Sequence, residues 1–96
     1  MPTFEWTERF GLDRDKLEST QRDAFNASFR QFVEDLQRGA FRKRLRVKPV
    51  QGKQDVWEMT WAGDGRATFS YGDEQRPGHK HVIWRRVGTH SVFRAP

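Results

Sequence analysis

A change in the spacing of apolar residues at Gly39 constrains the fold of this chain more than any other feature. After Gly39, short apolar runs alternate with clusters of turn residues, which is typical of strands. Gly39 itself is expected to end a helix, because glycine readily adopts the left-handed conformation of a helix C-terminus. Before it, apolar side chains recur at helical spacing and form one stripe: Phe25, Phe29, Phe32, Val33 and Leu36.

The helical segment has two candidate starting points. Asp13 is a candidate N-cap for a helix over residues 14–38. Ser19 and Thr20, with Asp23 three residues after Thr20, could cap a second helix. The segment is therefore expected to contain one helix or two.

Strand-like runs lie on both sides of the helical segment. Residues 3–9 alternate, with Phe4 and Trp6 on one side, and predict a half-buried strand. The predicted fold class is α+β, with an N-terminal strand, one or two helices, and a four-stranded, largely antiparallel sheet. The four later strands are expected at Leu45–Val50, Val56–Trp61, Arg66–Tyr71 and His81–Val87.

Length and composition exclude several classes of protein. The 96 residues suit a single domain, residues 1–96, whose core can use the 8 Phe and 4 Trp. Cysteine is absent, which excludes a disulfide framework and a thiolate metal site. His79 and His81 share a face of a strand without a third ligand, so we expect no metal site and no cofactor. No apolar run has membrane-spanning length and no signal peptide is evident, so we expect a cytoplasmic protein without a membrane partner.

Positive charge gathers in the stretch "RKRLRVK", residues 42–48. In an extended chain, Arg44, Arg46 and Lys48 would share one face at intervals of about 7 Å, close to the spacing of nucleic-acid phosphates. The alternative is an edge strand protected by its charges against aggregation. With a net charge of +5, the chain favours an anionic partner, either nucleic acid or an acidic protein. The later strands add further cations to the same predicted sheet: Arg66, Arg85 and Arg86.

Four pieces of the sequence, taken in order, resemble the RelE/ParE superfamily of bacterial toxins: "VKPVQG", "VWEMTW", "GRATFSY", and "VGTH" with an aromatic residue three positions on. The resemblance covers about residues 24–93. It implies a compact sheet with helical cover and a positively charged cleft for messenger RNA. It also implies a toxin of a toxin–antitoxin system, acting as a ribosome-dependent endoribonuclease in the A site and blocked by a cognate antitoxin.

The resemblance assigns roles to individual residues. The arginine that opens the "GRATFSY" strand falls on Arg66, and the catalytic position after the last strand falls on His90. Lys48 lies near a position where relatives carry a charged catalytic side chain, and Arg86 matches a basic residue on the last strand. Several relatives have a catalytic tyrosine where this chain has Phe93, which can stack on a base but cannot transfer a proton. The predicted RNA-binding residues are Arg44, Arg46, Arg85 and Phe93.

These residue types suit cleavage in which the RNA 2′-OH attacks the adjacent phosphate without a metal. Histidine titrates near neutral pH, so His90 is expected to act as general acid or base, and we favour the acid. Arginine is always charged, so Arg66 can stabilise the phosphorane. The general base is left open among Lys48, Glu58 and Asp64.

The "VGTH" turn bears on whether His90 is functional. Gly88 is expected to permit a tight turn after the last strand, and Thr89 to fix it by a hydrogen bond. His90 would then lie beside the basic cleft; the alternative is a capping histidine in an ordinary turn. Two other functions remain open, namely a ParE-type inhibitor of DNA gyrase without hydrolytic activity and a non-catalytic RNA- or protein-binding module.

Overall fold

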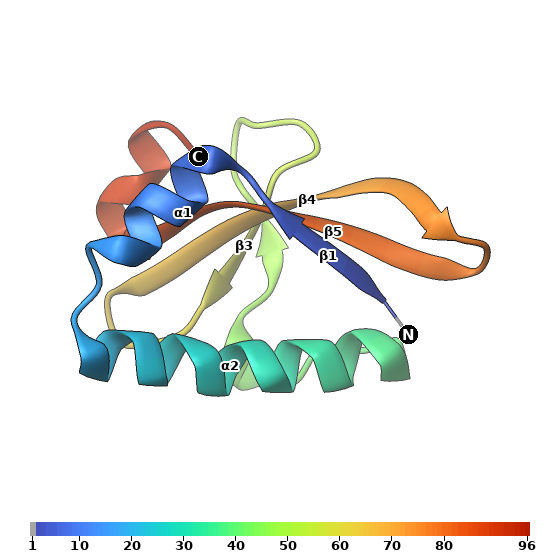
Figure 1. Ribbon diagram of the computed structural model, residues 1–96, viewed down its shortest axis with the longest axis horizontal. Coiled ribbons are helices and arrows are strands. Elements are labelled where there is room, and N and C mark those ends of the chain that lie inside the picture. Colours follow the sequence, from blue (N-terminus) through green and yellow to red (C-terminus); the bar gives the residue numbers. More distant parts are fainter. Residues whose placement is uncertain (1) are drawn as a thin grey trace.

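The computed structural model describes residues 2–96 and contains a five-stranded sheet flanked by helices (Figure 1). The strands lie in the order β1-β5-β4-β3-β2; β1 is parallel to β5, and the other neighbours are antiparallel. The predicted α+β class is confirmed, with the N-terminal strand joining the sheet as its fifth member. The elements are β1 (Thr3–Trp6), α1 (Glu8–Asp15), α2 (Ser19–Arg38), the 3-10 helix η1 (Lys43–Leu45), β2 (Lys48–Pro49), β3 (Trp57–Thr60), β4 (Gly65–Arg76), β5 (His79–Thr89) and the 3-10 helix η2 (His90–Arg94).

The helix α2 packs across one face of the sheet and builds the core through its aromatic stripe (Figure 1). The ring of Phe32 is buried and lies 5.0 Å from the rings of both Phe69 on β4 and Trp84 on β5. Such edge-to-face contacts add to the stabilisation that burial of the rings provides. Successive residues of a strand point to opposite sides of the sheet. Glu58 and Thr68 therefore lie on the side opposite α2, which we call the far face.

The helix boundaries differ from the prediction at their N-terminal ends. The first helix begins five residues before Asp13, and its N-cap is Thr7, whose hydroxyl accepts a hydrogen bond from the backbone N–H of Phe10. Asp13 is therefore an interior residue of α1, and its prediction as an N-cap is wrong. The N-cap of α2 is Glu18, whose N–H donates to the side chain of Gln21, so the predicted cap at Ser19 and Thr20 is also wrong.

At the end of α2 the prediction is confirmed. Gly39 has a φ of 88°, in the left-handed region, and its N–H donates to the carbonyl of Asp35. A side chain at this position would be strained. The arginine-rich segment begins three residues after this cap.

The predicted strand over residues 45–50 is wrong for most of its length. Only Lys48–Pro49 pair with β3, whereas Leu45 ends a 3-10 helix and Arg46 has a φ of 49°. The side chain of Leu45 is fully buried, which pulls this turn onto the core. Arg44, Arg46 and Lys48 therefore do not alternate along one extended strand.

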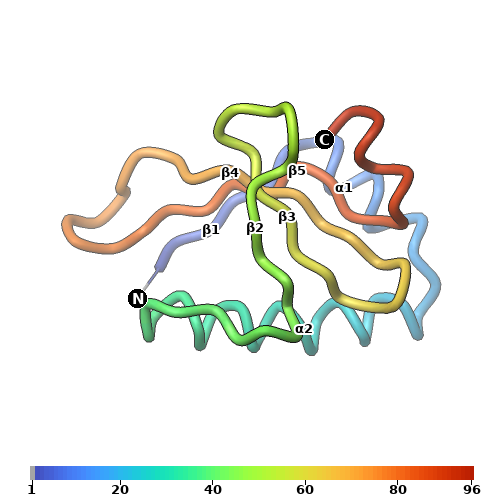
Figure 2. Tube along the Cα trace, turned by 180° about the vertical axis from the view of Figure 1, so that it is seen from behind, coloured from blue at the N-terminus to red at the C-terminus, as the bar shows by residue number. Residues whose placement is uncertain are grey.

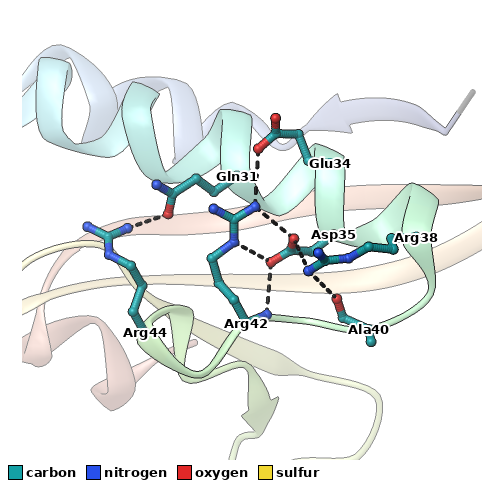
Figure 3. A network of polar contacts seen from close by, with 7 residues as sticks. All are labelled: Gln31, Glu34, Asp35, Arg38, Ala40, Arg42 and Arg44. Atoms are coloured by element: carbon teal, nitrogen blue, oxygen red, sulfur yellow. Dashed lines mark hydrogen bonds and ion pairs between the residues drawn. The ribbon is translucent and has the colours of Figure 1, made fainter.

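A buried ion-pair network explains why this segment turns (Figure 3). The carboxylate of Asp35, fully buried at the end of α2, accepts hydrogen bonds of 2.8 Å from the backbone N–H and from the guanidinium of Arg42. A further 2.8 Å bond comes from Arg38. These bonds, chiefly those from Arg42, lower the pKa of Asp35 to about 2. The network fixes residue 42 against the helix, so the chain beyond it cannot run as an extended strand.

The β4–β5 hairpin is longer than predicted. Within "GDEQRPG", Gly72 lies opposite His81 and Arg76 opposite His79, with an irregularity in the register between them, and residues 77–78 form the turn. Seen from behind, the 51–55 loop and the C-terminal end both lie on the side of the sheet opposite α2 (Figure 2). No helix among residues 2–96 combines the length and apolar character needed to cross a membrane.

Candidate nucleic-acid interface

A row of polar and charged residues crosses four strands on the far face. The strand register pairs Lys48 with Glu58, Glu58 with Thr68, and Thr68 with Arg86. Paired residues on neighbouring strands present their side chains on the same face about 5 Å apart. Lys48 and Arg86, which the sequence predicts as catalytic, therefore stand at the two ends of one row.

Arg66 is fixed at the turn between β3 and β4. Its Nη1 donates to the carbonyl oxygens of Ala62, Gly63 and Gly65 at 3.4, 3.2 and 2.9 Å. Three carbonyl acceptors hold one edge of the guanidinium and leave its other N–H groups available. Arg66 is paired in the sheet with Gly88, two residues before His90.

Three of the predicted arginines line one hollow. Arg44, Arg46 and Arg66 border a depression of about 360 Å³ at the β3–β4 turn, which we call the turn hollow. The guanidinium of Arg44 is oriented by a hydrogen bond to Gln31 of α2 (Figure 3). Among the residues that line the turn hollow, none is acidic. The predicted proximity of these three arginines thus has a geometric basis, although they meet at a turn and not on one extended strand.

The segment after β5 folds back onto the sheet as η2. A Cβ at Gly88 would lie 3.1 Å from the side chain of Val92, so glycine permits this close approach. The hydroxyl of Thr89 accepts a hydrogen bond of 3.4 Å from the N–H of Ser91 and caps η2, as predicted. His90 is exposed as the first residue of η2, and its ring makes an edge-to-face contact with Phe93 at 4.8 Å.

The two arginines at the end of β5 are held by other parts of the chain. Arg86 forms a mostly buried ion pair with Asp13 of α1, with 2.6 Å between Nε and Oδ2. Arg85 donates to the carbonyl of Pro96 at 3.0 Å and to the hydroxyl of Ser70 at 3.4 Å. The charge of Arg86 is therefore neutralised locally, which the sequence did not indicate.

Comparison with known proteins gives matches at the level of structure. No family profile matches the chain, and no curated protein sequence does. A chain of the E. coli DinJ-YafQ toxin-antitoxin complex superposes with a TM-score of 0.70 at 14% identity, covering 95% of this chain and 94% of that chain. The YoeB/ParE toxin from Agrobacterium tumefaciens gives 0.66 at 12% identity, covering 92% and 98%. A chain of the intact E. coli RelBE complex gives 0.63 at 20% identity, covering 93% and 96%.

This chain has the fold of the RelE/ParE toxins. The expected sheet with helical cover is thereby confirmed, and the order of the quoted sequence pieces follows the order of β2, β3, β4 and β5. In this RelE/ParE fold, Arg66 lies opposite Gly88 in the β4–β5 ladder, two residues before His90, and Gly65 lies opposite Thr89. Lys48 and Arg86 lie farther along the sheet, in the row described above.

Within the RelE/ParE fold, the structure gives positions to two residues whose surroundings the sequence did not indicate, Glu58 and His81. Glu58 is 9% exposed in the middle of the row, and among the described residues it has no ion-pair partner. His81, one of the two histidines weighed as metal ligands, is buried and lies 2.7 Å from both Thr3 and Glu5. Residues 2–96 contain no cluster of three or more side chains suited to a metal ion.

Proposed function

We propose that this chain is the toxin of a toxin–antitoxin system and a ribosome-dependent endoribonuclease that cuts messenger RNA in the A site. The observation that carries the proposal is the contact between the exposed His90 and Phe93 just after β5. Arg66 on β4 pairs with Gly88, two residues before His90. The RelE/ParE fold supports it, since the compared structures bearing this fold are toxins or their complexes. The net charge of +5 suits an RNA substrate.

In the proposed reaction the RNA supplies its own nucleophile. The 2′ oxygen loses its proton to a base and attacks the adjacent phosphorus, and the bond from phosphorus to the 5′ oxygen then breaks. His90 in its protonated form donates a proton to that leaving oxygen. Among the described residues, none makes a hydrogen bond to His90, so both ring nitrogens are available to the substrate.

Arg66 would stabilise the negative charge that develops on the phosphorane. Its guanidinium is already held by three carbonyl groups, so little reorganisation is needed when the charge appears. Arg44 and Arg46 would bind neighbouring phosphates through the turn hollow. The ring of Phe93 would stack on a base and take no part in proton transfer.

Glu58 is the base that the geometry favours among the three candidates. Its carboxylate lies on the far face between Lys48 and Thr68 and has no ion pair within residues 2–96. Asp64 is exposed in the β3–β4 turn, and Lys48 is exposed on the edge strand β2. A carboxylate accepts a proton at neutral pH, whereas a lysine must first lose one.

The proposed partners are the ribosome with its messenger RNA and a cognate antitoxin. Two of the compared structures are toxin–antitoxin complexes, DinJ-YafQ and RelBE. An acidic antitoxin segment would suit the basic turn hollow and would block it. The two other functions, gyrase inhibition and non-catalytic binding, do not require an accessible histidine beside arginines.

The deciding experiment maps cleavage of a defined messenger RNA on programmed ribosomes by primer extension, with the wild type and His90→Ala. The proposal predicts cuts within the A-site codon that need ribosomes and disappear in the variant. Growth arrest without any cut, together with loss of gyrase supercoiling activity, would support the ParE-type alternative. Binding of RNA without cuts or growth arrest would support a binding module.

A further inference from the structure

We infer that a second basic hollow, which shares no lining residue with the turn hollow, binds a phosphate group of the same RNA strand. This inference rests on the proposed function and adds two residues to it, Arg9 and Lys53. The hollow has a volume of about 420 Å³ and lies between the first turn of α1, the 51–56 loop, the end of β5 and the last two residues. We call it the α1 hollow.

The α1 hollow carries positive charge that the rest of the molecule does not neutralise. Four cationic side chains line it, and no Asp or Glu side chain does: Arg9, Lys53, Arg85 and Arg86. Arg86 is neutralised by Asp13, but within residues 2–96 the side chains of Arg9 and Lys53 have no ion-pair or hydrogen-bond partner. A concavity lined by charges of one sign focuses the electric field and raises the local concentration of anions.

Arg85 gives the α1 hollow a fixed donor. Its guanidinium is held at Nε by the carbonyl of Pro96 and at Nη1 by the hydroxyl of Ser70, which leaves Nη2 free. A guanidinium fixed at two points loses little entropy when it binds a phosphate oxygen. Arg9 comes from α1 and Lys53 from the 51–56 loop, so an anion in this hollow would meet cations from three separate segments of the chain.

The position of the α1 hollow favours RNA over an acidic protein as its ligand. Arg86 at its edge and His90 are four residues apart on one continuous segment, roughly 13 Å at about 3.3 Å per residue. A single RNA strand crosses that distance with a few nucleotides. A strand with its scissile phosphate at His90 and Arg66 can therefore place one flanking phosphate in the turn hollow and another in the α1 hollow.

The test compares Arg9→Ala/Lys53→Ala with a control that removes the same charge elsewhere, Lys16→Ala/Arg30→Ala. The probe is a fluorescent 12-nucleotide single-stranded 2′-O-methyl RNA, which cannot be cut, titrated at several salt concentrations. We expect the first variant to bind more weakly and to lower the salt slope by about 1.4, the value for two lost phosphate contacts to a single strand. The control is expected to keep the wild-type slope.

Equal losses in both double variants, or no binding by the wild type, would overturn the inference. So would unchanged RNA binding combined with weaker binding of poly-glutamate, which would assign the hollow to an acidic protein. If the double variant does not fold, Lys53→Gln in the exposed loop replaces it, with an expected slope change of about 0.7. If the protein binds RNA through this hollow but cuts no messenger RNA on programmed ribosomes, the inference stands and the proposed function fails.

Discussion

His90 owes its exposed position to its immediate neighbours. Gly88 allows Val92 to pack onto β5, and Thr89 caps the 3-10 helix that His90 begins. Among residues 2–96, the ring of His90 contacts that of Phe93. A side chain placed in this way by backbone constraints, and free of hydrogen bonds in the described structure, is preorganised to meet a substrate.

Replacing His90 by alanine is expected to lower the rate of messenger RNA cleavage on ribosomes by about 100-fold or more, the usual contribution of a general acid. Stability should hardly change, because the side chain is exposed. Single-turnover cleavage on programmed ribosomes measures the rate. His79→Ala, at the opposite end of β5, serves as the control and should cleave normally. A His90→Ala protein that cleaves at the wild-type rate would rule out the proposed acid.

The free energy of unfolding depends on whether the buried carboxylate of Asp35 is ionised. Its pKa in the folded protein is about 2, below the ordinary 3.8, because Arg42 and Arg38 bond to the ionised form. The resulting stabilisation is fully present above pH 3.8 and is lost as the pH falls toward 2. Asp35→Asn should lower the free energy of unfolding at pH 7 by about 3 kcal/mol, the scale for a buried ion pair that loses one partner.

Urea unfolding at pH 7 and at pH 3 measures both parts of this prediction. The stability difference between wild type and Asp35→Asn should be smaller at pH 3, because there the unfolded chain, with the ordinary pKa of 3.8, takes up a proton on Asp35 that the folded protein largely does not. Glu34→Gln is the matched control, since Glu34 is exposed and accepts a 3.1 Å hydrogen bond from Nη2 of Arg42. A difference that is the same at both pH values would contradict the assigned role of Asp35.

At the scale of elements, β1 pairs with the first part of β5, and α1 provides hydrogen-bond acceptors to β5 beyond the end of β1. β1 pairs with β5 only as far as Trp6 opposite Trp84, and Thr7 then donates its N–H to the carbonyl of Trp84. Beyond that point, the carboxylate of Asp13 accepts the N–H of Val87 at 3.2 Å and the guanidinium of Arg86. One helical carboxylate thus satisfies the backbone of an otherwise unpaired strand edge.

Removing this carboxylate should detach α1 from β5. We expect Asp13→Ala to lower the free energy of unfolding by about 2 kcal/mol, because a charged hydrogen bond is lost and Arg86 is left unpaired in a mostly buried position. Chemical denaturation followed by circular dichroism measures the loss. Asp15→Ala, an exposed position in the same helix, should have almost no effect. Comparable losses in the two variants would mean that the ion pair contributes little.

The sequence predicts the elements whose signals are local. The stripe of α2, its end at Gly39 and the cap at Thr89 all depend on neighbours in the chain, and all three are confirmed. The segment around Arg44 was mispredicted because Asp35, seven residues before Arg42, fixes its course through a tertiary ion pair.

In the candidate site, too, the sequence predicts features that depend on neighbours in the chain and misses those that depend on tertiary contacts. The exposed His90 beside Phe93 follows from the "VGTH" turn and the aromatic residue after it. The partner of Arg86 lies 73 residues away in α1, and no spacing along the chain could indicate it. The turn hollow likewise brings together residues of η1 and of the β3–β4 turn, which are far apart in the sequence.

At the scale of the whole molecule, the aromatic core lies between α2 and the sheet (Figures 1 and 2). The turn hollow lies at the β3–β4 turn and includes Arg44, which bonds Gln31 of α2, whereas the α1 hollow lies between α1, the 51–56 loop and the last two residues. With a net charge of +5, the protein should attract RNA over distances up to the Debye length, about 8 Å at physiological salt. Binding is therefore expected to depend steeply on ionic strength.

Arg46→Ala tests the contribution of the turn hollow to this charge effect. Arg46 is exposed, and its loss should weaken RNA binding uniformly across sequences and lower the salt slope by about 0.7 for a single strand. Fluorescence anisotropy with two unrelated 12-nucleotide RNAs measures both properties. Arg76→Ala, at the far tip of the hairpin, removes the same charge and should leave the slope unchanged. A loss confined to one RNA sequence would show that Arg46 reads bases, against the role assigned to it.

The most direct test of the central claim is cleavage of a messenger RNA on programmed ribosomes when one A-site nucleotide lacks its 2′-OH. Transcripts with ribose or with a single 2′-deoxynucleotide before the scissile bond would be compared by primer extension. We predict ribosome-dependent cutting of the ribose transcript at that bond, and no cutting there in the deoxy transcript. Equal cutting of both would contradict attack by the 2′-OH, and no cutting of either would contradict the proposed activity.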